Sequence, residues 1–216
     1  MDGGFAVYTD ADGERVLREH FEVESRAIAG GWEDSWREFH RGVEIGRFWV
    51  GPPWEEASPG AEAIVIDPGR AFGTGGHATT RLTLEWLQEL RPTSLLDVGC
   101  GSGVLAIAAV KLGFTPVIGI DTDETAVEVT LANARVNGVQ LDARRSDALQ
   151  DELPETEVAV ANVALDVVEQ LLPRLPASQL VASGYLERDE PDLRGWRRID
   201  RRTADGWAAD LLARGP

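Results

Sequence analysis

Short apolar runs alternate with amphipathic segments along most of this 216-residue chain. The apolar run at 94–98 is typical of a buried strand, and the segment 80–90 repeats apolar side chains at helical spacing. Such alternation predicts an α/β protein with a doubly wound sheet. The last two predicted strands, 196–200 and 207–212, have no helix between them, so an antiparallel pair is expected at one edge. Further strands are predicted at 63–67, 116–121, 157–163 and 179–184, and further helices at 104–113, 125–137 and 165–172.

The pattern divides the chain into three predicted parts. We expect residues 1–30 to form a small N-terminal α/β appendage, residues 31–60 an aromatic-rich linker, and residues 61–216 the main domain. The linker contains several aromatic residues, of which Trp32 and Trp36 come first. They are expected to form either a docking face for a polypeptide or a buried core between domains, and the sequence leaves both open.

A glycine-rich turn joins the strand at 94–98 to the helix that follows it. Its pattern is Asp97-x-Gly99-x-Gly101-x-Gly103. Glycines at such a turn let backbone N–H groups and a helix N-terminus approach a ligand closely, because no Cβ intervenes. A dinucleotide site needs room there for a pyrophosphate, whereas an acidic residue beside the turn suits a cation better. We therefore predict binding of S-adenosylmethionine, which carries an ammonium and a sulfonium, with Asp97, Gly99 and Gly101 among its contacts.

Three polar residues follow strands, or lie near strand ends, later in the chain. Asp121 ends the predicted strand 116–121, about twenty residues beyond the turn, where ribose hydroxyls of adenosyl ligands are bound. Alternatively, Asp121 could simply be a residue at the start of the next helix. Asp147 could accept a hydrogen bond from an adenine amino group, or could simply be solvated. Asn162 ends another apolar strand, and ligands of open α/β sheets gather at the carboxyl ends of strands.

A second candidate for cofactor contact is the glycine-rich loop at 68–80. Long loops of this kind are uncommon inside compact domains unless they bind or cover something. Thr79 or Thr80 is expected to cap the following helix, to contact the ligand, or to do both. His77 is a candidate general base, although a lone His in a glycine loop is more often a structural hydrogen-bonding group.

The composition of the chain restricts the kinds of partner that it is expected to bind. Acidic residues outnumber basic ones, 37 to 21, which gives a formal net charge of −16. Such a chain would be repelled by phosphate backbones, so stable nucleic-acid binding is not expected. The same charge would attract a basic protein, although solubility alone explains it equally well. One Cys excludes an internal disulfide, no apolar run is long enough to span a bilayer, and we expect a cytoplasmic enzyme without a metal.

Taken together, these motifs resemble those of a known protein family. The turn at 97–103, with Asp121 and Asn162 at their spacing, is similar to that of class I S-adenosylmethionine-dependent methyltransferases. The loop at 66–80, together with Trp36 and the segment 47–54, resembles the ribosomal protein L11 methyltransferase family. The similarity extends from about Trp32 to Gly184 and implies a Rossmann-like, mostly parallel seven-stranded sheet.

The resemblance also implies roles. Thr80, Gly99, Asp121 and Asn162 would bind S-adenosylmethionine, and Phe72 would lie over it. The family methylates lysine and N-terminal amines of a ribosomal protein, so the expected partner is the free, basic ribosomal protein L11. Asn162 would then orient the amine through its side-chain carbonyl.

Only about thirty residues precede Trp32, whereas the family has a larger N-terminal domain that docks the ribosomal protein. A methyltransferase acting on a small molecule or on another protein is therefore a second hypothesis. A cofactor-binding module without catalysis, or a nicotinamide-binding protein, is a third.

Overall fold

The computed structural model describes residues 41–67 and 75–215. Contacts divide the chain between Phe39 and His40, and the described residues all lie in the second unit. The proposed appendage at 1–30 falls outside the described residues, as do Trp32, Trp36 and Phe72. No helix in the described part is long and apolar enough to span a bilayer.

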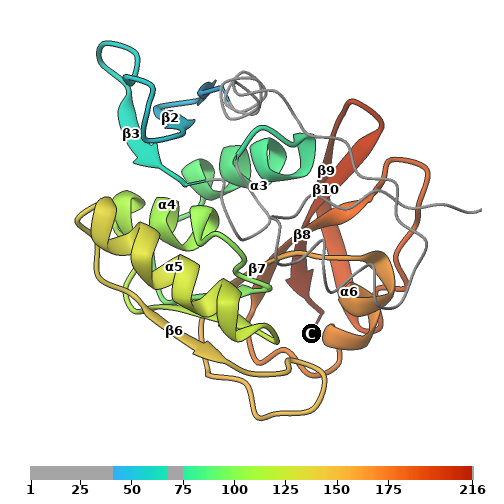
Figure 1. The fold of residues 1–216 in the computed structure, drawn as a ribbon. Coiled ribbons are helices and arrows are strands. Elements are labelled where there is room, and N and C mark those ends of the chain that lie inside the picture. The colour runs from blue at the N-terminus through green and yellow to red at the C-terminus, as the bar shows by residue number, and fades with distance from the viewer. Residues whose placement is uncertain (1–40, 68–74, 216) are drawn as a thin grey trace, which may run out of the picture. The chain divides into compact units, whose positions relative to one another are not determined.

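The unit is built around a seven-stranded sheet with the order β6-β5-β4-β7-β8-β10-β9 (Figure 1). The first five strands in this order are parallel, and β10 pairs with β8 and β9 antiparallel. The expected doubly wound sheet with an antiparallel edge is thus confirmed. The strands are β4 (Leu95–Val98), β5 (Val117–Asp121), β6 (Asp142–Arg145), β7 (Val158–Asn162), β8 (Gln179–Leu186), β9 (Trp196–Ala204) and β10 (Trp207–Arg214).

Helices cover both faces of this sheet (Figure 1). On one face, apolar side chains of α3 and α4 pack with those of the sheet, and Ala134 of α5 joins them. On the other face, Val168 and Leu171 of α6 pack in a second core. Strands covered on both faces are largely apolar, which is why most of their residues read as hydrophobic runs. The helices are α3 (Ala78–Glu89), α4 (Val104–Leu112), α5 (Glu124–Val136) and α6 (Leu165–Leu171).

A smaller three-stranded sheet precedes α3. It contains β1 (Val43–Ile45), β2 (Phe48–Gly51) and β3 (Glu62–Val65) in that order, with β2 and β3 parallel. The stretch expected as a linker therefore supplies β1 and β2, and β2 pairs with β3, a strand from the expected main domain.

Two local features differ from the sequence-based expectations. β6 was expected to be a connecting segment, because its sequence Asp-Ala-Arg-Arg has no apolar pattern; it forms a strand by pairing along its backbone with β5 at the sheet edge. For Thr79 or Thr80 a helix cap, a ligand contact or both were expected; the N-cap of α3 is His77, so both threonines lie in the first turn, and the ligand contact stays a prediction.

A buried ion pair organises the short connection between β8 and β9. Arg201 donates to both carboxylate oxygens of Asp210, at 2.7 and 2.8 Å, and Asp210 is fully buried. The same guanidinium donates to the carbonyls of Glu187 and Asp189. Side-chain hydrogen bonds thus hold the connection in place where no crossover helix is present.

Candidate functional site

The predicted site residues gather at the carboxyl edge of the parallel strands. Asp97 belongs to β4, Asp121 is the last residue of β5, and Asn162 is the last residue of β7. β4 lies between β5 and β7 in the sheet, so the three residues are on adjacent strands. Ligands of open α/β sheets bind at this edge, where the strand order reverses.

The backbone of the glycine turn is already hydrogen-bonded within the protein. The N–H groups of Gly99 and Cys100 both donate to the Ile120 carbonyl, and the Gly101 N–H donates to Asp121 Oδ2 at 3.0 Å. The Gly103 N–H donates to the Cys100 carbonyl at 2.7 Å. These four N–H groups therefore do not form the free donor cradle that a pyrophosphate requires.

Asp97 lies beneath the turn and is only 1% exposed. Its Oδ2 accepts a hydrogen bond from the Ala106 N–H at 3.1 Å, while its Oδ1 has no partner among the described residues. Burial raises the pKa of Asp97 to about 7, opposed by the Ala106 hydrogen bond and assisted by the nearby Asp121 charge. An unpaired, buried carboxylate oxygen is suited to accept from a cationic group of a ligand.

Asp121 joins the turn to β5. One carboxylate oxygen accepts from Gly101, and the other accepts from the Asp123 N–H at 3.0 Å. Each oxygen retains a further lone pair, and the side chain is partly exposed. It can therefore accept from ligand hydroxyls while it fixes the turn.

The segment after the glycine-rich loop reaches the same edge from α3. Thr80 is 2% exposed, and Asn162 Nδ2 lies 3.4 Å from Thr80 Oγ1. This contact uses the amide nitrogen of Asn162 and not its carbonyl oxygen. Thr80 and Asn162 are 82 positions apart, and only the fold brings them together.

At the start of α3, His77 caps the helix and packs against a neighbouring ring. Its Nδ1 accepts from the Thr79 N–H and lies 2.8 Å from Thr79 Oγ1. The ring packs edge-on against Trp207, with centroids 4.8 Å apart. Capping and packing explain His77 without catalysis, and its role as a base stays a prediction.

Asp147 and Cys100 likewise have local partners. Asp147 accepts from the Leu149 N–H at 2.9 Å and from the Gln150 side chain at 2.6 Å, which closes the turn after β6. An adenine contact by Asp147 stays a prediction. Burial raises the pKa of the Cys100 thiol to about 12, so it is a packing residue rather than a nucleophile.

One residue to which the sequence gave no role, Gly184, also shapes the site. Gly184 is the extra residue of a bulge in β8, because Ala208 and Ala209 of β10 oppose Tyr185 and Ser183. A Cβ at Gly184 would lie 2.7 Å from the Val163 carbonyl carbon and closer still to its oxygen. A Cβ at Gly99 would meet the Val163 side chain at 2.7 Å. The backbone after Asn162 thus fits between two glycines, a contact that no sequence pattern indicates.

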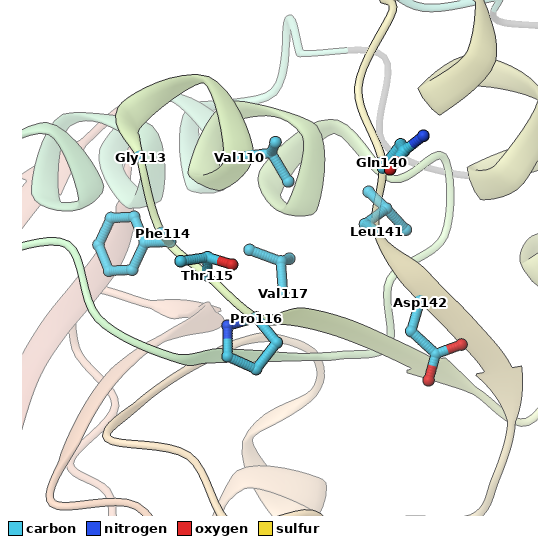
Figure 2. A pocket seen from close by; sticks show the side chains of 9 residues that line it. All are labelled: Val110, Gly113, Phe114, Thr115, Pro116, Val117, Gln140, Leu141 and Asp142. Atoms are coloured by element: carbon cyan, nitrogen blue, oxygen red, sulfur yellow. The ribbon is translucent and has the colours of Figure 1, made fainter.

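A separate hollow of about 490 Å³ lies near the amino ends of β5 and β6 (Figure 2). Its lining includes Phe114, Pro116 and Leu141. It is at the opposite edge of the sheet from Asp97 and Asp121, so it is distinct from the candidate cofactor site.

Comparison with solved structures supports the fold. The crystal structure of the ribosomal protein L11 methylase from Lactobacillus delbrueckii subsp. bulgaricus superposes with a TM-score of 0.74 at 27% identity, covering 82% of this chain and 100% of that one. The Pyrococcus abyssi tRNA (uracil-54, C5)-methyltransferase, in complex with S-adenosylhomocysteine, shares the fold with a TM-score of 0.56 at 17% identity, over 81% of this chain and 43% of that one. Sheet order and the turn after β4 define a Rossmann-like methyltransferase fold.

Sequence comparison gives the family. The family described as ribosomal protein L11 methyltransferase (PrmA) matches residues 7–208. The chain therefore belongs to this family. A ribosomal protein L11 methyltransferase from Azotobacter vinelandii is 41% identical, covering 78% of this chain and 67% of the relative. One from Caldanaerobacter subterraneus is 43% identical, covering 84% and 64%. The matches thus span about two thirds of the length of these relatives.

Proposed function

We propose that this protein is an S-adenosylmethionine-dependent N-methyltransferase that methylates lysine or N-terminal amines of ribosomal protein L11. Membership of the family and the names of its relatives support the reaction and the substrate. The site residues proposed for the cofactor are Thr80, Gly99, Gly101, Asp97, Asp121 and Asn162, with Phe72 and Asp147 as further candidates.

The observation that carries the proposal is the chemistry of the turn. Four of its N–H groups are used within the protein, and Asp97 presents an unpaired buried oxygen beneath it. Asp121 adds a second carboxylate at the same edge. This combination disfavours a pyrophosphate and fits an adenosyl ligand with a cationic amino acid portion.

The roles of the residues follow from their positions. When bound, S-adenosylmethionine supplies a methyl group activated by its sulfonium. Asp97 would hold the ammonium of the cofactor, and Asp121 would accept from its ribose hydroxyls. The Asn162 carbonyl and the backbone carbonyl of Val163 would accept from the two N–H groups of a neutral amine and point its lone pair at the methyl.

The amine must lose its proton before it attacks. A free lysine has a pKa of about 10.4, and removal from water lowers it because the charged form is disfavoured. Asn162 and the Val163 carbonyl carry no charge, so they would orient the amine and favour its protonated form less than a carboxylate would. Rate then comes mainly from positioning and from exclusion of water.

Two measurements test the proposal. Titration calorimetry should detect binding of S-adenosylmethionine and none of NAD; binding of NAD alone would overturn the methyltransferase assignment. Incubation with methyl-labelled cofactor and purified ribosomal protein L11 should transfer label to the protein. Cofactor binding without transfer would instead support a methyltransferase with another acceptor, because the chain matches only about two thirds of its relatives.

A further inference from the structure

One side of α5 carries polar residues where an ordinary packing helix has apolar ones. Thr130 and Asn133 of α5 and its C-cap residue Asn137 recur at spacings of three and four residues, which puts them along one side of the helix. Thr130 is fully buried and Asn133 is 3% exposed. Buried polar side chains persist when they are hydrogen-bonded, so their partners indicate what this face does.

At one side, the face holds the glycine turn. Thr130 Oγ1 donates to the Gly101 carbonyl at 3.0 Å, and Asn133 Nδ2 donates to the Ser102 carbonyl at 2.8 Å. The approach is close, since a Cβ on Gly103 would lie 3.1 Å from the Thr130 Cα. Two carbonyls of the turn are therefore fixed by α5, just as the N–H groups of Gly99, Cys100 and Gly101 are fixed by β5.

At the other side, the same face holds the end of β3. Asn137 Oδ1 accepts from the Val65 N–H at 2.8 Å, and its Nδ2 donates to the Val65 carbonyl at 2.7 Å. The side-chain amide of Asn137 thus bonds both the N–H and the carbonyl of Val65, as the backbone of a neighbouring strand would. Asn133 Oδ1 accepts from the Asp67 N–H at 3.4 Å, so Asn133 contacts both the turn and this segment.

These contacts join the glycine turn, to which Gly101 and Ser102 belong, to a segment that is far from it in sequence. The segment 65–67 precedes α3, which contains Thr80, and residues 68–74 between them lie outside the described part. We propose that Asn133 and Asn137 are positioning residues, which set the distance between the turn and the segment leading to α3 and so determine cofactor affinity without touching the cofactor. This inference rests on the proposed function, because it concerns the same site.

The test compares Asn133→Ala and Asn137→Ala with the wild-type protein. We expect the dissociation constant for S-adenosylhomocysteine, measured by calorimetry, to rise about tenfold in Asn133→Ala and about threefold in Asn137→Ala. The KM for S-adenosylmethionine should rise in parallel while kcat stays within about twofold, because neither side chain is among those proposed to bind the amine. Hydrogen exchange at the Val65 amide should also accelerate in Asn137→Ala.

Two control variants separate positioning from general destabilisation. Val168→Ala removes buried atoms from α6 on the opposite face of the sheet and should lower Tm without changing the dissociation constant. Glu128→Ala changes an exposed position of α5 and should change neither. Should Asn133→Ala not fold, Asn137→Ala, which is only partly buried, carries the test.

The outcomes distinguish this inference from the proposed function. Variants that fold and bind S-adenosylhomocysteine as tightly as the wild type would overturn the positioning role alone. If Val168→Ala weakened binding as much as the two Asn variants do, the loss would reflect general destabilisation, and the positioning role would be overturned too. Failure of the wild-type protein to bind S-adenosylhomocysteine would overturn the proposed function itself.

Discussion

Asp97 combines two tasks that usually fall to different residues. The N-cap of α4 is Gly103, which has no side chain to bond the first N–H groups of the helix. Asp97 reaches from β4 and accepts from Ala106 in the first turn of α4. One oxygen therefore caps the helix, and the other, which has no partner among the described residues, is the one proposed to hold the ammonium of the cofactor.

A protonation change should accompany cofactor binding. Because burial raises the pKa of Asp97 to about 7, ionisation of this group opposes folding, and that opposition grows as pH rises from about 4 towards 7. A bound cation favours the carboxylate and lowers its pKa, so binding should release a proton near pH 7. Affinity should therefore increase between pH 6 and pH 8. Calorimetry in buffers of different ionisation enthalpy measures the proton, and Asp97→Asn should abolish it; an equal release in that variant would refute the assignment.

Two neighbouring acids offer a matched comparison. Asp121→Asn removes a charge from the candidate ribose contact and should weaken cofactor binding by about 1.5–3 kcal/mol, the usual worth of a charge-assisted hydrogen bond. Asp123 caps α5 through the Thr125 N–H at 2.8 Å. Asp123→Asn retains a capping side chain, so its affinity should match the wild type. Equal losses in the two variants would mean that the effect is not specific to Asp121.

At the scale of elements, the bulge in β8 is the feature that shapes the site. Gly184 has a φ of 102°, a conformation that other residues rarely adopt. It leaves space for the backbone of Val163, whose N–H donates to the Ser183 carbonyl at 3.0 Å. A bulge beside a site changes the direction of the neighbouring backbone. Here that backbone carries the Val163 carbonyl, which is proposed to accept a hydrogen bond from the substrate amine.

Gly184→Ala should impair catalysis more than cofactor binding. The added Cβ would displace the Val163 carbonyl, so we expect kcat to fall at least tenfold while the dissociation constant for S-adenosylhomocysteine changes less. Gly60→Ala is the control, because Gly60 has a similar φ of 89° but nothing within 4 Å of an added Cβ. Steady-state kinetics of both variants provide the measurement. A similar fall in kcat for Gly60→Ala would contradict a local role of Gly184.

Sequence patterns predicted most elements of the sheet but not all of its pairing. Strands covered on both faces, such as β4 and β7, are apolar apart from one polar residue each, Asp97 and Asn162, and were predicted correctly. β6 is held by backbone hydrogen bonds to β5, and such bonds depend little on side-chain identity. The bulge at Gly184 depends on the register between β8 and β10, which a single strand does not encode.

For the whole molecule, the net charge of −16 matters for the proposed substrate. A strongly acidic enzyme attracts a basic protein over several ångströms, and salt screens that attraction. The KM for ribosomal protein L11 should therefore rise several-fold between 0.05 and 0.5 M NaCl, with kcat little changed. Steady-state methylation at fixed, saturating cofactor measures this. A KM that does not depend on salt would show that charge has no part in substrate recognition.

The sequence by itself determined the α/β class, the antiparallel edge, the glycine turn and the acids near it, because helical and strand periodicity and glycine spacing are local properties. Only the tertiary structure decided which atoms each residue uses. It put Thr80 beside Asn162, gave His77 the N-cap of α3, occupied the N–H groups of the turn, and joined α5 to Val65. These outcomes depend on contacts between residues far apart in the chain, which form only when the sheet and its helices have packed together.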